Sequence, residues 1–163
     1  MEVGAHENEL GLGDLDSAVR RHESWLVGRL ALVVGDREEA RDLAQQTFLR
    51  AAEHWPIGDD AHVARWLSVV GVRLAIGERR RRRRWGFLLI AESDSSWAIT
   101  TDPDLWRALE RLDRRTRAAL VLTVVEGYSQ DEAASALGVA RGTLASWLAR
   151  ARPALRAALV EGD

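Results

Sequence analysis

Residues 128–155 contain the side chains of this chain that are best suited to a defined chemical task. A short segment opens with Ser129 and Glu132 and ends at Gly138, and a second segment starts at Arg141. Ser129 and Glu132 match a capping box, in which each side chain accepts the backbone N–H of the other residue. Gly138 is typical of the left-handed residue that ends a helix. The pattern predicts two short helices joined by a tight turn.

The second predicted helix has one apolar face and one polar face. Leu144, Leu148 and Ala151 recur at three- and four-residue spacing, so they are predicted to face inward. The polar side chains left outside are Arg141, Thr143, Ser146, Arg150 and Arg152. Such a face suits the major groove of DNA, where a recognition helix docks its N-terminal residues. The alternative is an ordinary helical hairpin within a bundle, because helix pairs are common.

Length and composition limit the class of protein. The 163 residues have room for one large or two small domains, and the absence of cysteine excludes disulfides and thiolate-ligated zinc. The N-terminus has no basic segment followed by an apolar run, and no apolar stretch approaches membrane-spanning length. A soluble cytoplasmic protein with no membrane partner is therefore expected.

Positive charge is concentrated in the middle of the sequence. Residues 57–100 contain 8 arginines and 5 acidic residues, whereas residues 1–56 contain 6 arginines and 11 acidic residues. Six arginines are consecutive, from Arg79 to Arg84. Blocks of like charge often form solvated linkers. Phosphate binding is favoured here, because the block continues a core-forming helix and can neutralise a nucleic-acid backbone from a fixed place.

The apolar periodicity predicts an all-α fold. Residues 1–9 are expected to be mobile, and helices are expected from 14–17 to 35, over 38–54 and over about 61–84, with a loop at 56–60. Further helices are expected from 104 to 112 and over 114–126, before the helix-turn-helix. The fold class is therefore two small helical domains, 10–86 and 104–160, joined by a flexible linker at 87–103. The second is a four-helix domain with a helix-turn-helix.

Three runs resemble, in order and spacing, the extracytoplasmic-function (ECF, group IV) sigma factors of bacterial RNA polymerase, of the sigma-70 family and actinobacterial type. Residues 35–55 (GDREEARDLAQQTFLRAAEHW) are similar to the helix that grips the polymerase clamp. Residues 64–84 (ARWLSVVGVRLAIGERRRRRR) are similar to the helix that melts the promoter and recognises its −10 element. Residues 112–155 resemble the domain that recognises the −35 element.

The resemblance implies a transcription initiation factor and no catalysis by this chain, since polymerase makes the RNA. Its implied partners are core RNA polymerase and promoter DNA, with an anti-sigma factor as a further partner, and it implies no cofactor and no metal. The segment 10–86 corresponds to sigma region 2, and 104–160 corresponds to sigma region 4.

The resemblance also assigns residues to three surfaces. The polymerase-binding residues are Asp42, Gln45, Gln46, Phe48 and Leu49. The residues for the −10 region are Ile57, Asp60, Arg65, Arg73, Arg79, Arg80 and Arg83. Ile57 and Asp60 belong to a loop that captures an unstacked base and must compensate the few kcal/mol of exposing it. The residues for the −35 region are Ser129, Gln130, Arg141, Gly142, Thr143, Ser146, Trp147 and Arg150.

Four positions on these surfaces depart from the family's pattern. Arg73 and Gly77 stand where members usually have asparagine and aspartate, and Ala145 and Trp147 stand where basic residues are common. A second function therefore stays open, a sigma-like regulatory protein that binds polymerase or an anti-sigma partner but recognises promoter DNA poorly. The spacing lets the Trp147 indole either pack between the helices or face DNA, and partial packing is favoured.

Two further departures concern the second helix of the helix-turn-helix. Ala140 replaces the usual serine or threonine cap, a loss of about 1 kcal/mol. Pro153 falls inside the helix, where it removes the hydrogen bond to Ala149 and is expected to kink the helix.

An enzyme is the weakest alternative. The only histidines are His6, His22, His54 and His62, and no two of them are four residues apart. They are interpreted as surface residues, and Asp59-Asp60 as solvated loop residues. No Ser/His/Asp or glycine-loop arrangement appears.

Overall fold

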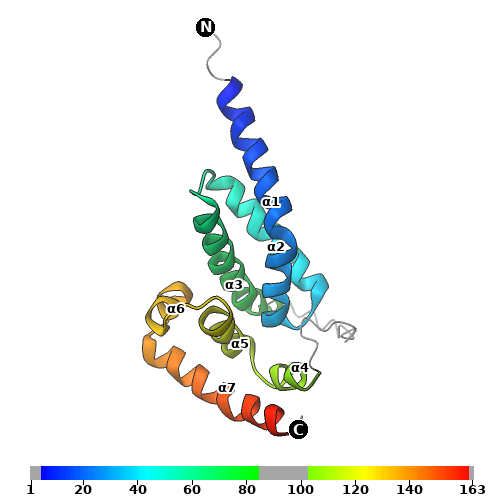
Figure 1. Ribbon diagram of the computed structural model, residues 1–163, viewed down its shortest axis with the longest axis vertical. Helices are drawn as coiled ribbons and strands as arrows, with labels where there is room; N and C mark the ends of the chain where they lie inside the picture. Colours follow the sequence, from blue (N-terminus) through cyan, green and yellow to red (C-terminus); the bar gives the residue numbers. More distant parts are fainter. Residues whose placement is uncertain (1–4, 85–102, 162–163) are drawn as a thin grey trace.

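The computed structural model describes residues 5–84 and 103–161, without the side chains of 5–13, 78–84, 105 and 158–161. Three helices form the N-terminal domain, α1 (Ala5–Val34), α2 (Arg37–Glu53) and α3 (Asp60–Arg84) (Figure 1). The C-terminal domain has α4 (Pro103–Glu110), α5 (Arg114–Leu120), a π-helical turn η1 (Val121–Val125), α6 (Gln130–Leu137) and α7 (Arg141–Glu161). All regular structure in the described ranges is helical, so the predicted fold class is confirmed.

The core of the N-terminal domain lies where α1, α2 and α3 meet. Thr47 is fully buried, and its hydroxyl donates to the Leu43 carbonyl oxygen at 2.7 Å. A Cβ atom at Gly71 of α3 would lie 3.1 Å from the Leu30 side chain and 3.2 Å from the Thr47 hydroxyl. Glycine at 71 therefore lets α3 approach both of the other helices closely. The large apolar side chains buried there are Leu26, Leu30, Val33, Leu43, Leu67 and Val72.

Local signals fix most helix boundaries. Gly35, with a φ of 78°, follows the end of α1, and the Asp36 carboxylate accepts the Glu39 N–H at 2.7 Å to start α2. Asp59 accepts the His62 N–H at 2.9 Å at the start of α3. The expected start of the first helix at 14–17 is wrong, because α1 already begins at Ala5. The charged and glycine residues near position 14 favour a helix start there, but the helix continues through them towards the N-terminus.

The helix-turn-helix forms as predicted. The Ser129 N–H donates to Glu132 Oε2 at 2.8 Å, and the Glu132 N–H donates to Ser129 Oγ at 3.2 Å. Gly138 has a φ of 66° and ends α6 in the left-handed conformation. Leu144 of α7 is fully buried in the same core as Ala133 and Ala134 of α6. The capping box and the glycine turn are thus confirmed.

The segment before the turn differs from the continuous helix expected over 114–126. It is α-helical to Leu120 and then widens into η1, and the Tyr128 N–H donates to the Leu122 carbonyl oxygen at 2.9 Å. Val124 and Val125, the last two apolar residues of this segment, are 73% and 43% exposed. The extra residue per turn rotates them out of the register that buries Val121 and Leu122.

The two domains pack against each other. The segments α5, η1 and α6 contact α1 and α3, and Figure 1 shows α5 beside the lower end of α3. The candidate surfaces therefore lie on one body.

Candidate nucleic-acid interface

The outward face of α2 forms a ridge of Asp42, Gln45, Gln46 and Leu49. Asp42 and Gln45 are exposed, Gln46 is half-buried, and Leu49 is 68% exposed. Phe48 is half-buried and packs on the core beneath the ridge. The ridge is therefore largely exposed to solvent. It offers hydrogen-bonding groups beside one large apolar side chain, a combination suited to a protein partner.

The loop before α3 is tied to α1. Ile57 is half-buried and packs on the core, and Asp60 is the first residue of α3. The Asp60 carboxylate lies 2.9 Å from His22 Nε2 and forms an ion pair with Arg21. The hydrogen bond with His22 holds the pKa of Asp60 below its usual range, with a smaller contribution from Arg21. This carboxylate therefore stays charged at neutral pH.

One sequence interpretation of this region is wrong. His22 is only 8% exposed, so it is a buried partner of Asp60 and not a surface residue. Asp59 and Asp60 are exposed, as interpreted from the sequence, and Asp59 also accepts the backbone N–H of His62 and lies 2.7 Å from the ring nitrogen of His62. The hydrogen bond from that backbone N–H lowers the pKa of Asp59.

Arg65 and Arg73, two candidates for the −10 region, point at the C-terminal domain. The Arg65 guanidinium lies 4.4 Å from the centre of the Tyr128 ring and 3.4 Å from Glu132 Oε1. Arg73 Nε donates to the Ala136 carbonyl oxygen at the end of α6. Both guanidinium groups are thus engaged by the other domain. The side chains of Arg79, Arg80 and Arg83 lie outside the described residues.

The helix-turn-helix presents a polar outer face on α7. Arg141, Gly142, Thr143, Ser146 and Arg150 are all exposed. Arg141 Nε lies 3.4 Å from Asp131 Oδ1, and Ser146 Oγ donates to the Gly142 carbonyl oxygen at 2.9 Å. On α6, Ser129 is exposed and Gln130 is half-buried. These −35 candidates are therefore exposed, apart from the half-buried Gln130.

Trp147 is the exception among these candidates. Its exposed fraction is 8%, and it belongs to the same buried cluster as Leu144. The favoured packing role is confirmed, and the alternative orientation towards DNA is not the one observed.

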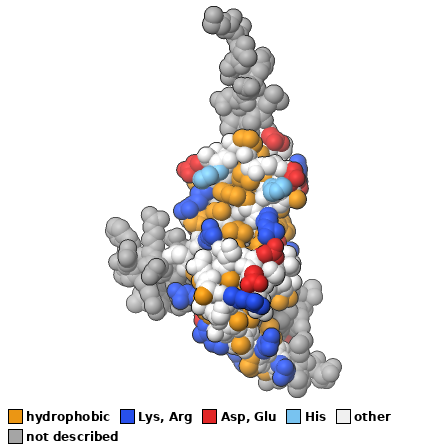
Figure 2. All heavy atoms as spheres, turned by 90° about the vertical axis from the view of Figure 1, so that its left-hand side faces the viewer, with side chains coloured by type: hydrophobic (Ala, Val, Ile, Leu, Met, Phe, Trp, Pro, Cys, Tyr) orange, Lys and Arg blue, Asp and Glu red, His pale blue; other side chains and the backbone are white. Residues whose placement is uncertain are grey.

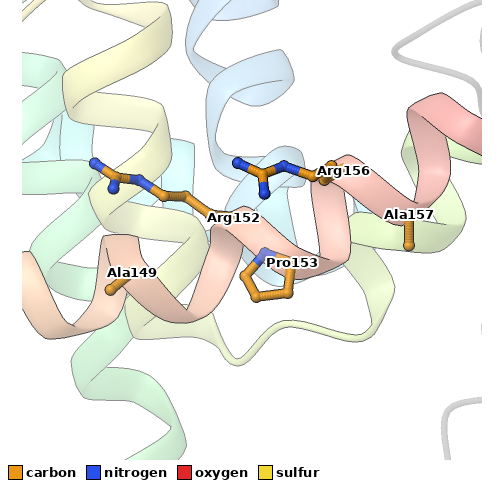
Figure 3. A pocket seen from close by; sticks show the side chains of 5 residues that line it. All are labelled: Ala149, Arg152, Pro153, Arg156 and Ala157. Atoms are coloured by element: carbon orange, nitrogen blue, oxygen red, sulfur yellow. The ribbon is translucent and has the colours of Figure 1, made fainter.

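Two further exposed arginines lie in the second half of α7. Arg152 and Arg156 extend to the same side of the helix, on either side of Pro153, and they line a shallow hollow with Ala149 and Ala157 (Figure 3). Pro153 lies inside α7, as expected, and is exposed. The sequence analysis did not include Arg156 among the candidate DNA-binding residues, because a proline normally interrupts a helix and no local pattern indicates that α7 continues beyond Pro153.

Basic groups are dispersed over the side where α3 and α6 meet. Figure 2 shows blue side chains interleaved with apolar and acidic ones on that face, with no continuous basic sheet. Nucleic-acid contact there must depend on individual arginines. None of the helices in residues 5–84 and 103–161 is long and apolar enough to cross a membrane.

We expect the replacement of Ser129 by alanine to destabilise the protein by about 1 kcal/mol, because α6 loses its N-terminal cap. Denaturant unfolding of the full chain, followed by circular dichroism, measures this loss. Ser135→Ala is the matched control, since Ser135 is an exposed serine on the same helix. Equal stability of the two variants would show that the cap is dispensable.

The cap also has a pH dependence of known sign. Hydrogen bonding to the Ser129 N–H lowers the pKa of Glu132, and Arg65 adds to the effect. The pKa of Glu132 is lower in the folded state than in the unfolded state. The Glu132 carboxylate therefore contributes to the stability of the fold above its unfolded pKa of about 4.3, and this contribution is lost as the pH falls through the folded-state pKa.

Two family models match the chain in sequence order. Sigma-70 region 2 matches residues 18–85, and Sigma-70, region 4 matches residues 103–155. The first match spans most of the three N-terminal helices, and the second includes the helix-turn-helix.

Curated relatives cover most of the chain. The ECF RNA polymerase sigma factor SigL of Mycobacterium tuberculosis is 34% identical over 140 residues, 79% of each chain. SigM of the same species is 33% identical over 147 residues, 86% of this chain and 74% of SigM. EcfG of Rhodopseudomonas palustris is 32% identical over 137 residues, 77% of this chain and 74% of EcfG.

The fold is also that of a solved sigma factor. RpoE of Bartonella quintana, crystallised in complex with the anti-sigma factor NepR, superposes with a TM-score of 0.65. The match covers 90% of this chain and 96% of that one, at 24% identity, and supports the fold alone. The two region matches and the mycobacterial relatives together show that this chain belongs to the ECF RNA polymerase sigma factors, of the actinobacterial type.

Proposed function

We propose that this chain binds core RNA polymerase and directs it to specific promoters, and that it catalyses no reaction itself. The observation that carries the proposal is the order of the region 2 and region 4 matches on a fold with an exposed α2 ridge and an exposed helix-turn-helix face. The proposal places the protein in the cytoplasm with polymerase and its template.

The proposed division of labour follows the two domains. Residues 10–86 would bind polymerase, recognise the −10 element and help to melt the DNA, and residues 104–160 would recognise the −35 element. Residues 87–103 would act as the linker, which lies outside the described residues apart from its last position. The proposed −10 residues are Ile57, Asp60, Arg65, Arg73, Arg79, Arg80 and Arg83.

The proposed −35 surface uses the exposed side of the helix-turn-helix. Arg141, Thr143, Ser146 and Arg150 would meet base edges and phosphates, since recognition helices place such donors in the major groove. Ser129, Gln130 and Gly142 would lie near the DNA backbone at the N-terminal ends of α6 and α7, where free N–H groups favour phosphate. The buried position of Trp147 argues for leaving it out of this surface.

Changing Asp42, Gln45 and Gln46 together to alanine is expected to weaken binding of core polymerase by tenfold or more. Each side chain can supply a hydrogen bond of about 1 kcal/mol, and alanine preserves the helix. A binding titration with core polymerase measures the effect, and circular dichroism checks the fold. Ser17, Glu23 and Ser24, exposed residues of α1, supply the matched triple-alanine control. Unchanged affinity would move the polymerase-binding surface away from α2.

A sigma-like regulator that recognises DNA poorly is the second candidate. Trp147 is buried where basic residues are common in the family, and Arg73 is engaged by the C-terminal domain. Run-off transcription with core polymerase on a pool of genomic fragments separates the two candidates. A defined start site supports the active sigma factor, whereas polymerase binding without any start site supports the regulator.

An anti-sigma factor is a further proposed partner. The Bartonella quintana protein of the same fold was crystallised with its anti-sigma factor. An inhibitor of this chain would have to compete with polymerase or promoter DNA for the surfaces described above.

A further inference from the structure

The two aspartates at the start of α3 have different tasks. Asp59 caps the helix, because its carboxylate accepts the His62 N–H at 2.9 Å and its carbonyl oxygen accepts the Val63 N–H at 2.9 Å. The Asp60 carboxylate instead contacts two residues of α1, His22 and Arg21. The start of α3 is thus already capped by Asp59, and the contacts of Asp60 serve another purpose.

Asp60 is held through only one of its two carboxylate oxygens. Oδ1 lies 2.9 Å from His22 Nε2 and also accepts a hydrogen bond from Arg21. Oδ2 has no hydrogen-bond partner among the residues that the structure describes, and the Asp60 side chain is 54% exposed. The carboxylate is therefore fixed at one oxygen and accessible at the other.

His22 is the rigid partner in this arrangement. Its exposed fraction is 8%, and its ring makes an edge contact with Trp25, with ring centroids 5.9 Å apart and planes at 68°. The Arg21 side chain is 55% exposed, so it can follow the carboxylate. The bond from His22 keeps the pKa of Asp60 below its usual range, and an ionised carboxylate only accepts hydrogen bonds. His22 Nε2 therefore donates, and a buried ring sets the direction of an exposed charge.

An ionised carboxylate discriminates between bases by their donors. Cytosine and adenine carry an exocyclic amino group where thymine carries a carbonyl oxygen. The free oxygen of Asp60 would accept a hydrogen bond from that amino group and would repel the thymine oxygen. This preference requires a fixed carboxylate, because a freely rotating one can turn away from the wrong base.

We propose that His22 is a positioning residue for recognition of the −10 element, which holds Asp60 Oδ1 so that Oδ2 faces the amino group of an unpaired cytosine or adenine. The inference rests on the proposed function of Asp60 in base capture. His22 itself touches no DNA. Its loss should relax the choice of base more than it weakens binding of polymerase or of the rest of the promoter.

Replacements of His22 separate this role from simple packing. His22→Gln keeps an N–H donor near the place of Nε2 but loses the ring, whereas His22→Phe keeps a ring against Trp25 and loses the donor. His22→Asn, whose amide is one carbon shorter and falls short of Asp60, repeats the loss of the donor without a second aromatic ring. His62→Ala is the matched control, because His62 is an exposed histidine whose partner is Asp59.

The probe is a promoter recovered by run-off transcription from the genomic pool, with its −10 segment left unpaired and one base varied at a time. Holoenzyme containing the full chain is titrated with each version. At one position, the unchanged chain should bind cytosine or adenine about tenfold more tightly than thymine, the size expected of one hydrogen bond to a charged group. His22→Phe, His22→Asn and Asp60→Asn should bring this ratio close to one. His22→Gln and His62→Ala should keep most of it.

The possible outcomes separate this inference from the proposed function. A preserved ratio in His22→Phe together with a lost ratio in His22→Gln would show that the ring matters for packing, and the positioning role would be overturned. An Asp60→Asn variant that keeps every base preference would also overturn it, while promoter-directed transcription would still support the sigma function. If the genomic pool yields no promoter, the proposed function fails, and this inference fails with it.

Discussion

Replacing Arg79–Arg84 by glutamine is expected to weaken promoter binding by the holoenzyme by tenfold or more at physiological salt. The block ends α3, the helix that also contains the −10 candidates Asp60, Arg65 and Arg73. Each phosphate contact that is lost removes about 0.9 from the slope of log affinity against log salt, so six contacts would reduce its magnitude by up to about 5. A salt titration of promoter affinity measures both quantities.

The control must change positive charge elsewhere on the same domain. Arg20 and Arg50 are exposed arginines of α1 and α2, and their replacement by glutamine should leave the slope almost unchanged. If the six-residue variant keeps the slope of the unchanged holoenzyme, the block is a solvated segment and the phosphate-binding hypothesis is wrong.

Local sequence signals were sufficient for most of the fold. The Ser129–Glu132 capping box and Gly138 act within a few residues, so the sequence predicts them and the structure contains them. The exposed α2 ridge followed from 3.6-residue periodicity, because one face of that helix must cover the core.

Such local signals do not predict contacts between side chains that are far apart in the sequence. The ion-paired residues Arg29 and Glu126 are 97 positions apart in the sequence, and Arg114 and Glu39 are 75 positions apart. Arg73 donates to the carbonyl oxygen of Ala136, which is 63 positions away. A charged residue on a predicted helix is normally assigned to solvent, since most such residues are exposed. Only the docking of the two domains shows which arginines have partners. The same limit explains the misassignment of His22, whose partner Asp60 is 38 positions away.

The candidate site was predictable in outline for a related reason. Exposure of Arg141, Thr143 and Ser146 follows from the helix register, and the structure agrees. The engagement of Arg65 by Tyr128 and Glu132 does not follow from it. The sequence therefore located the candidate DNA-binding surfaces, whereas the contacts of Arg65 with residues of the other domain required coordinates.

Replacing Trp147 by alanine is expected to destabilise the C-terminal domain by about 3–5 kcal/mol, because it removes a buried indole and leaves a cavity between the helices. For a domain of this size, that loss lowers the melting temperature of residues 103–161 by roughly 15–30 °C. Thermal unfolding of the full chain, followed by circular dichroism, measures the shift. Trp147→Phe should lose much less, since it keeps most of the apolar volume.

The matched control for Trp147 is Arg150→Ala on the same helix, an exposed site where the change in stability should stay within about 0.5 kcal/mol. Trp147→Arg supplies the opposite test. The arginine would introduce the basic residue that is common in the family, but at this buried position it would place an unpaired charge in the core. We therefore expect it to unfold the helix-turn-helix and to abolish −35 binding. A Trp147→Arg variant with an unchanged melting temperature and tighter −35 binding would mean that this side chain faces the groove in solution.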